Sequence, residues 1–137
     1  MNDKFKFRGL AKNNEWCYGS LLYYADDAQI WEQDGKNYIV NPETVGQCIG
    51  LKDKNGNLIY EGDIVKSDFN FITNTINPLK FKIGNVISSD YIAGFVIASD
   101  INDYSPYKTS FFGKTEALNC IVIGNIYENK ELLESEG

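Results

Sequence analysis

The sequence contains no histidine, and this absence excludes several common kinds of enzyme. A Ser-His-Asp triad, a Cys-His pair and a His-ligated zinc or iron site all require an imidazole ring. The chain also has no GxxxxGKS/T pattern to hold a triphosphate and no GxGxxG pattern to open a nucleotide-binding helix. We therefore expect a protein that is not an enzyme and that uses neither a cofactor nor a metal ion.

Long hydrophobic segments are also missing. There is no run of about 18 apolar residues, and no apolar N-terminal stretch precedes a cleavage site. The three cysteines, Cys17, Cys48 and Cys120, form no CxxC pair and lie in apolar, strand-like runs. A free cysteine in such a run usually serves as a small core residue of a protein in a reducing compartment. These features predict a cytoplasmic protein that does not interact with a membrane.

Basic residues are fewer than acidic ones, and the net charge is −6. Proteins that bind nucleic acids draw much of their affinity from Lys and Arg near phosphates, so the acidic balance disfavours this function. Lys4, Lys6 and Arg8 alternate along the first predicted strand and would form a local basic stripe, so nucleic-acid binding stays an open alternative. The other interpretation of these three residues is a solvated strand face.

Residues typical of strands dominate the chain. Ile, Val, Tyr, Phe and Thr are abundant, and helical periodicity is nearly absent. The sequence therefore predicts a mostly β protein with one short C-terminal helix at 130–134, capped by Asn129. The predicted strands cover 5–9, 15–24, 30–31, 38–40, 44–51, 58–60, 64–65, 81–87, 92–99 and 119–127, and 100–113 is predicted to be a loop.

Two subdomains are expected. Residues 1–50 form an N-terminal antiparallel β region, and residues 51–137 form a small SH3-like or barrel-like β subdomain with an inserted arm at about 67–79. In the subdomain 51–137, the alternation of core residues along two predicted strands is interrupted at Gly84-Asn85 and at Gly124-Asn125. A glycine at positive φ in such a place indicates a β-bulge that curls the sheet. Alternatively, each glycine makes room for a neighbouring aromatic ring.

Two carboxylates are candidates for a functional surface. Glu61 and Asp63 lie two residues apart, so a continuous strand would point both toward one side, where they suit a cation or a shared proton. Gly62 between them favours a bend instead, with Asp63 bound to the local backbone. Asp53, in the turn 52–57, partly resembles a calcium loop, but the ligand spacing and the terminal Glu are missing.

Aromatic residues crowd the first quarter of the chain, and Trp16, Tyr18 and Trp31 are further candidates for a functional surface, beside Tyr23 and Tyr24. They form either a stacking platform for bases or sugars or, as strand-spaced aromatics more often do, part of a core or subunit interface.

Six segments carry a family resemblance: Phe7 to Gly9, Glu15 to Leu21, Pro42 to Gln47, Gly50 to Gly56, Ile59 to Val65 and Ile123 to Asn129. In this order they resemble the YopX family of bacteriophage and prophage proteins, although Cys17 and Cys48-Ile49 depart from the residues usual in the family. The resemblance does not cover 67–79 or 100–113. It implies a phage accessory protein with a β-barrel-like C-terminal part, acting in a bacterial host cell, and it assigns no catalytic residues.

These observations lead to two functional hypotheses. The first is a non-enzymatic binding or assembly module whose partner is a host or phage protein or a second copy of the chain. The alternative is a nucleic-acid-binding protein of the SH3-like barrel type, based on the succession of Gly62-Asp63-Ile64-Val65 and Gly84-Asn85-Val86.

Overall fold

The structure is a computed structural model that describes residues 6–67, 69–70, 75–76, 82–89, 94–98 and 109–134. It confirms the mostly β prediction: antiparallel sheets account for most of the described chain, and the helices are few and short. The chain divides into two compact units, Met1–Gly50 (unit 1) and Leu51–Gly137 (unit 2). Among the described residues, no helix is both long enough and apolar enough to span a membrane.

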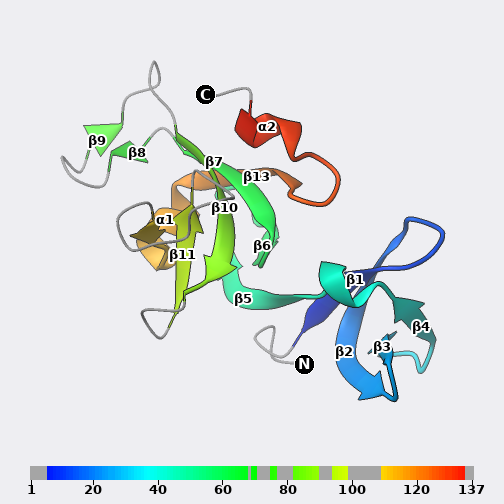
Figure 1. The fold of residues 1–137 in the computed structure, drawn as a ribbon. Helices are drawn as coiled ribbons and strands as arrows, with labels where there is room; N and C mark the ends of the chain where they lie inside the picture. Colours follow the sequence, from blue (N-terminus) through cyan, green and yellow to red (C-terminus); the bar gives the residue numbers. More distant parts are fainter. Residues whose placement is uncertain are drawn as a thin grey trace. The chain divides into compact units, whose positions relative to one another are not determined.

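Unit 1 begins with four strands in which each strand pairs antiparallel with the next. They are β1 (Phe7–Leu10), β2 (Trp16–Tyr24), β3 (Asp27–Trp31) and β4 (Asn37–Val40), shown in blue to cyan in Figure 1. The sheet curls until its ends meet, because Val40 forms a bridge with Ala11. The Asn41 N–H also donates to the Leu10 carbonyl at 2.9 Å.

The alternation of residues along these strands separates an inner face from an outer face. The inner face holds a buried cluster of Cys17, Ala28, Ile30 and Val40. Gly9 also lies inside, where an added Cβ would stand 2.6 Å from Val40 Cγ2. The missing side chain of Gly9 therefore lets β1 approach the core closely.

A short 3-10 helix, η2 (Pro42–Thr44), follows β4, whereas the sequence predicts a strand that begins at Thr44. Proline suits the first turn of a helix because it lacks the N–H that would be unsatisfied there. The Asn41 side chain accepts from the Glu43 N–H at 3.0 Å and so caps the turn. The strand prediction is therefore wrong at its start, and β5 (Gly46–Lys52) begins two residues later and pairs with β1.

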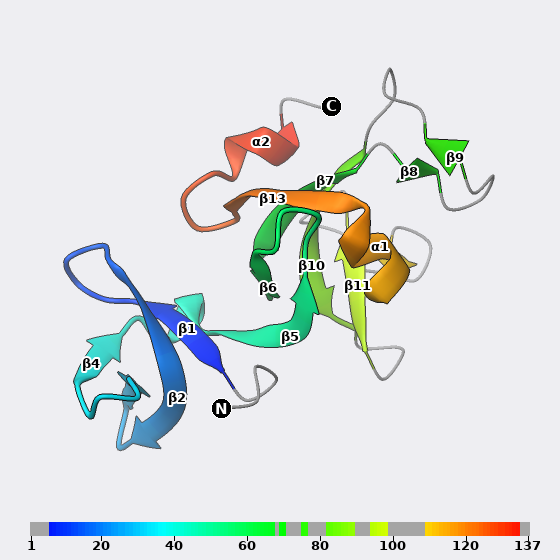
Figure 2. The same ribbon diagram turned by 180° about the vertical axis from the view of Figure 1, so that it is seen from behind.

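Unit 2 contains a five-stranded antiparallel sheet with the order β12-β11-β10-β7-β13. Figure 2 labels four of these strands, β11, β10, β7 and β13. The buried core of unit 2 includes Ile64 and Val65 of β7, Val86 of the central strand β10 and Ala98 of β11. The strands are β7 (Asp63–Ser67), β10 (Lys82–Ser88), β11 (Phe95–Ala98), β12 (Thr109–Phe111) and β13 (Cys120–Asn125), and the helices are α1 (Lys114–Leu118) and α2 (Glu131–Glu134).

Three short strands complete unit 2. β6 (Leu58–Tyr60) is the neighbour of β5 in its sheet. Within the arm predicted at about 67–79, β8 (Phe69–Asn70) pairs with β9 (Thr75–Ile76), and most of the other residues of this arm lie outside the described residues.

The two predicted β-bulges have different outcomes. The register between β13 and β7 shifts between Val122 and Gly124, so a bulge is present there. The register of β10 with β7 is continuous through Gly84, and the pairing with β11, which begins at Asn85, shows no shift, so the bulge predicted at Gly84 is wrong. A Cβ on Gly84 would lie 2.7 Å from Ile97 Cγ1, so this glycine makes room for a neighbour, which is aliphatic rather than aromatic. Neither glycine has the positive φ that the prediction assumed.

Three further predictions for unit 2 are wrong. The predicted loop 100–113 contains β12, which pairs with β11, and the helix α1 was not expected. The predicted last strand continues to 127, but β13 ends at Asn125 in a turn. The Asn129 side chain accepts from the Asn125 N–H at 3.1 Å, so it fixes this turn instead of capping the helix.

Candidate functional site

The outer face of unit 1 collects large apolar side chains. Tyr18, Leu22 and Tyr24 follow each other on one side of β2, because strand side chains alternate. Trp31 of β3 shares this side, since it pairs with Ser20. Ile39 of β4 lies on this side as well, because Leu22 pairs with Gln29 of β3 and Gln29 pairs with Ile39. We use "outer face" for these five residues: Tyr18, Leu22, Tyr24, Trp31 and Ile39.

The outer face is exposed and nearly uncharged. The exposed fractions are 40% for Tyr18, 47% for Leu22, 72% for Tyr24, 39% for Trp31 and 51% for Ile39. Asp27 is the only charged residue in β2, β3 and β4. Exposed aromatic and aliphatic residues with few charges are typical of the centres of protein–protein interfaces.

Trp16 lies on the same side of β2, next to Tyr18, and is held from β1. The Arg8 guanidinium lies 4.6 Å from the centroid of the Trp16 ring. This distance permits a cation–π interaction. Arg8 is only 6% exposed, so it does not extend a basic stripe on the surface. Lys4, the first residue of the stripe proposed from the sequence, lies outside the described residues.

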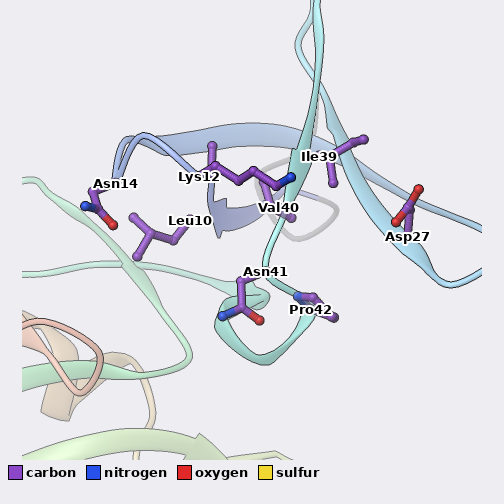
Figure 3. A pocket seen from close by; sticks show the side chains of 9 residues that line it. Leu10, Lys12, Asn14, Asp27, Ile39, Val40, Asn41 and Pro42 are labelled. Atoms are coloured by element: carbon purple, nitrogen blue, oxygen red, sulfur yellow. The ribbon is translucent and has the colours of Figure 1, made fainter.

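A pocket of about 410 Å³ lies beside the end of β4 (Figure 3). Leu10, Ile39, Val40 and Pro42 give it apolar walls. Its polar groups come from Lys12 and Asn14 on the β1–β2 turn, Asp27 of β3, and Asn41. The Lys12 side chain extends across the pocket toward Val40 in Figure 3. Polar and apolar groups line the pocket in nearly equal measure, so it is more polar than a usual small-molecule site.

In unit 2, Glu61 and Asp63 belong to a bend. Gly62 has a φ of +90°, and the Asp63 carboxylate accepts from the Tyr60 N–H at 2.8 Å. Glu61 accepts from the Ser88 hydroxyl at 2.6 Å. The bend expected from Gly62 is thus confirmed, and the Asp63 carboxylate is 2% exposed and serves the turn. A functional surface at these two residues stays a prediction.

Asp53 is likewise occupied by the backbone. Its carboxylate accepts from the N–H groups of Asn55 at 2.9 Å, Asn57 at 2.8 Å and Val122 at 2.9 Å. Burial raises the pKa of Asp53, but these hydrogen bonds outweigh burial and hold the pKa below its usual range. The turn that partly resembles a calcium loop is therefore closed by its own N–H groups. Among the described residues, no three His, Cys, Asp or Glu side chains are grouped to hold a metal ion.

The three cysteines are free and buried, as predicted. Burial, followed by the charges of Asp53 and Asp63, raises the pKa of Cys120 to about 12. Burial, followed by the charges of Glu32 and Glu15, also raises the pKa of Cys17. A thiol with a raised pKa is a weak nucleophile at neutral pH, so these cysteines act as core residues.

The structure brings Trp16, Tyr18 and Trp31 onto one side of one sheet, whereas Glu61 and Asp63 belong to the other unit. Sequence reasoning missed Leu22, Ile39 and the whole pocket. The alternation from Tyr18 to Tyr24 is a signal that points to Leu22. Lys12 and Asn41 come together only through the curl of the sheet, and no sequence signal marks them.

Comparison with known proteins gave a family and a similar fold. The YopX protein family model matches residues 6–134. The crystal structure of protein EF1440 from Enterococcus faecalis is similar, with a TM-score of 0.55 and 24% sequence identity, over 93% of this chain and 96% of that one. This likeness shows a shared fold. No curated protein matches the chain. Because the family model spans nearly the whole sequence, the chain belongs to the YopX family.

Proposed function

We propose that the chain is a non-enzymatic binding module that docks a protein partner on the outer face of unit 1. The observation that carries this proposal is the surface of β2, β3 and β4, where five large apolar side chains are exposed and Asp27 is the only charge. Interface cores are enriched in Tyr and Trp and depleted of charged residues. An accessory role in a phage-infected or lysogenic bacterium, in the cytoplasm, fits the family resemblance and is part of the proposal.

The partner is either another protein or a second copy of the chain. Tyr and Trp side chains frequently dominate the binding free energy of an interface, so Tyr18, Tyr24 and Trp31 are the residues expected to matter most. Leu22 and Ile39 belong to the row of paired residues between the row of Tyr24 and the row of Trp31. In a complex they would exclude water from the contacts of these aromatic rings.

The alternative, nucleic-acid binding, has less support on this surface. β2, β3 and β4 contain no Lys or Arg, and an aromatic platform for single strands normally works together with a basic groove. A gel-shift at low salt with single- and double-stranded probes distinguishes the two functions, since phosphate contacts are strongest there. A shift that Leu22→Ser leaves unchanged would favour the nucleic-acid function.

The test of the proposed function is retention of partners by the immobilised full chain from a bacterial lysate, with sedimentation velocity to detect self-association. Leu22→Ser removes an exposed leucine from the outer face, and Leu118→Ser removes one of similar exposure (53%) from unit 2. We expect Leu22→Ser, and more strongly Leu22→Ser combined with Tyr24→Ser, to lose a partner or a dimer that Leu118→Ser keeps. Equal retention by all variants would refute the proposal.

A further inference from the structure

Strand β4 ends its sheet; on the side away from β3 it meets Leu10 and Ala11 at Asn41 and Val40 but has a free edge nearer its start. It pairs with β3 along its whole length, and on its other edge only Val40 is bridged, to Ala11. The Asn41 N–H, which donates to Leu10, shows which residues face that other edge. Because backbone groups of alternate residues point to the same edge of a strand, Ile39 and Asn37 also direct their N–H and C=O groups away from β3. Within the described ranges, no strand pairs with them there.

The pocket lies at the end of this free edge. Ile39, Val40 and Asn41 belong both to the edge and to the pocket wall. Its volume of about 410 Å³ is modest for a ligand site and suits one or two side chains of a peptide. An extended chain laid along Asn37 and Ile39 therefore reaches the pocket without a turn.

Lys12 and Asp27 are charged residues that line the pocket, and Lys12 is the one whose side chain extends across it in Figure 3, so the charge expected of the peptide depends on Lys12. Among the described residues the Lys12 ammonium forms no ion pair, and Asn41 uses its side-chain oxygen for the Glu43 N–H, which leaves its NH₂ group as a donor. Both are donors suited to a carboxylate. The apolar walls at Leu10, Val40 and Pro42 suit an aliphatic or aromatic side chain beside it.

We propose that the β4 edge and its pocket bind an extended segment of a partner protein, which adds as a strand beside Asn37 and Ile39. The segment inserts an apolar side chain into the pocket and presents an acidic group to Lys12. Strand addition of this kind obtains its affinity from main-chain hydrogen bonds and its specificity from side-chain pockets. The inference rests on the proposed function and names its partner class, since Ile39 also belongs to the outer face.

The test pans a display library of short randomised peptides against the full chain and measures the affinity of recovered peptides by fluorescence anisotropy. We expect sequences in which an apolar residue adjoins Asp or Glu. Asn37→Pro removes an N–H that faces away from β3, so it leaves the ladder intact. It should weaken binding by about tenfold. Asn37→Ala keeps the N–H and should bind like wild type, whereas Lys12→Ala should lose the preference for acidic peptides.

A second measurement does not depend on how the variants fold. Recovered peptides are resynthesised with N-methyl groups at alternate residues. Methylation of the residues that face β4 should abolish binding, and methylation of the residues between them should not. A library without binders, or binders that tolerate both methylation patterns and Asn37→Pro, would overturn the inference. So would a wild-type dimer that Asn37→Pro dissociates, because a second copy would then occupy the edge.

The outcomes also separate this inference from the proposed function. A lysate partner that is lost with Leu22→Ser but retained with Asn37→Pro would support docking on the outer face and refute strand addition. No partner in either experiment would refute both.

Discussion

Asp53 accepts a hydrogen bond from the backbone N–H of Val122 at 2.9 Å, across 69 positions of the sequence. The same carboxylate closes its own turn through the N–H groups of Asn55 and Asn57. One buried side chain therefore fixes the turn between β5 and β6 and attaches it to β13, the strand that contains the bulge.

Replacing this carboxylate should destabilise unit 2 strongly. Asp53→Asn keeps the size of the side chain but turns one acceptor into a donor that faces an N–H group. Hydrogen bonds to charged groups contribute about 1.5–3 kcal/mol each, so we expect a loss of about 3 kcal/mol in the free energy of unfolding at neutral pH. Urea denaturation measures it. A loss below about 0.5 kcal/mol, the range of ordinary surface substitutions, would contradict this role.

The pKa of Asp53 also predicts a pH dependence. Because its pKa in the folded state lies below the unfolded value, the ionised carboxylate contributes stability that is complete above about pH 5 and is lost as the pH falls through the folded pKa. The difference in unfolding free energy between wild type and Asp53→Asn should therefore shrink on acidification. Urea titrations from neutral pH to about pH 3 test this, and a constant difference would contradict it.

Thr44 joins β1 to η2 through its hydroxyl. The hydroxyl donates to the Asn41 carbonyl at 2.6 Å and accepts from the Leu10 N–H at 2.9 Å, and Thr44 is buried. Thr44→Val has nearly the same shape but leaves both backbone groups without this partner, which should cost about 1–3 kcal/mol. Thr44→Ser keeps the hydroxyl and should retain most of the stability in thermal unfolding. Equal losses for the two variants would show that packing, not the hydroxyl, matters here.

Gly62 and Gly56 form a matched pair for measuring a close contact. Both have positive φ, +90° and +84°, but a Cβ on Gly62 would lie 3.0 Å from Tyr127 Cε2, whereas one on Gly56 would meet nothing within 4 Å. Gly56→Ala should cost about 1–2 kcal/mol for the left-handed backbone, and Gly62→Ala should cost more. A smaller loss for Gly62→Ala in urea denaturation would contradict the contact with Tyr127.

The buried cysteines should not react in the folded protein. With a pKa of about 12, about one Cys120 thiol in ten thousand is ionised at pH 8. A chromogenic disulfide reagent should therefore label Cys120 only as fast as the protein unfolds, and should label all three cysteines in denaturant. Rapid labelling of Cys120 under native conditions would contradict its place in the core.

Much of the fold was predictable from the sequence, because strand signals are local. The alternation from Trp16 to Tyr24 and the turn at Asp34-Gly35 place β2 and β4 almost at their observed bounds. The bend at Gly62 was equally predictable, since glycine between two acidic residues favours a turn. These elements depend on neighbours within a few residues.

The parts that failed depend on distant partners. Gly84 is required by Ile97 on the next strand, and β12 forms because β11 offers it an edge. The candidate site was predictable only in part for the same reason. Trp16, Tyr18 and Trp31 were named from composition, but their shared side follows from the pairing of Ser20 with Trp31. The pocket forms only where Val40 bridges to Ala11, which is distant in the sequence.

The central claim is that the outer face of unit 1 contacts another protein. Site-specific incorporation of a photo-crosslinking amino acid in place of Tyr24, in bacteria that produce the full chain, tests it most directly. Leu118 is the control position, since it is also exposed (53%, against 72% for Tyr24) but lies on α1 of unit 2. We predict crosslinks from position 24 to a defined protein or to a second copy of the chain, and none of comparable yield from position 118. Absence of crosslinks from position 24, or the same products from both positions, would contradict the claim.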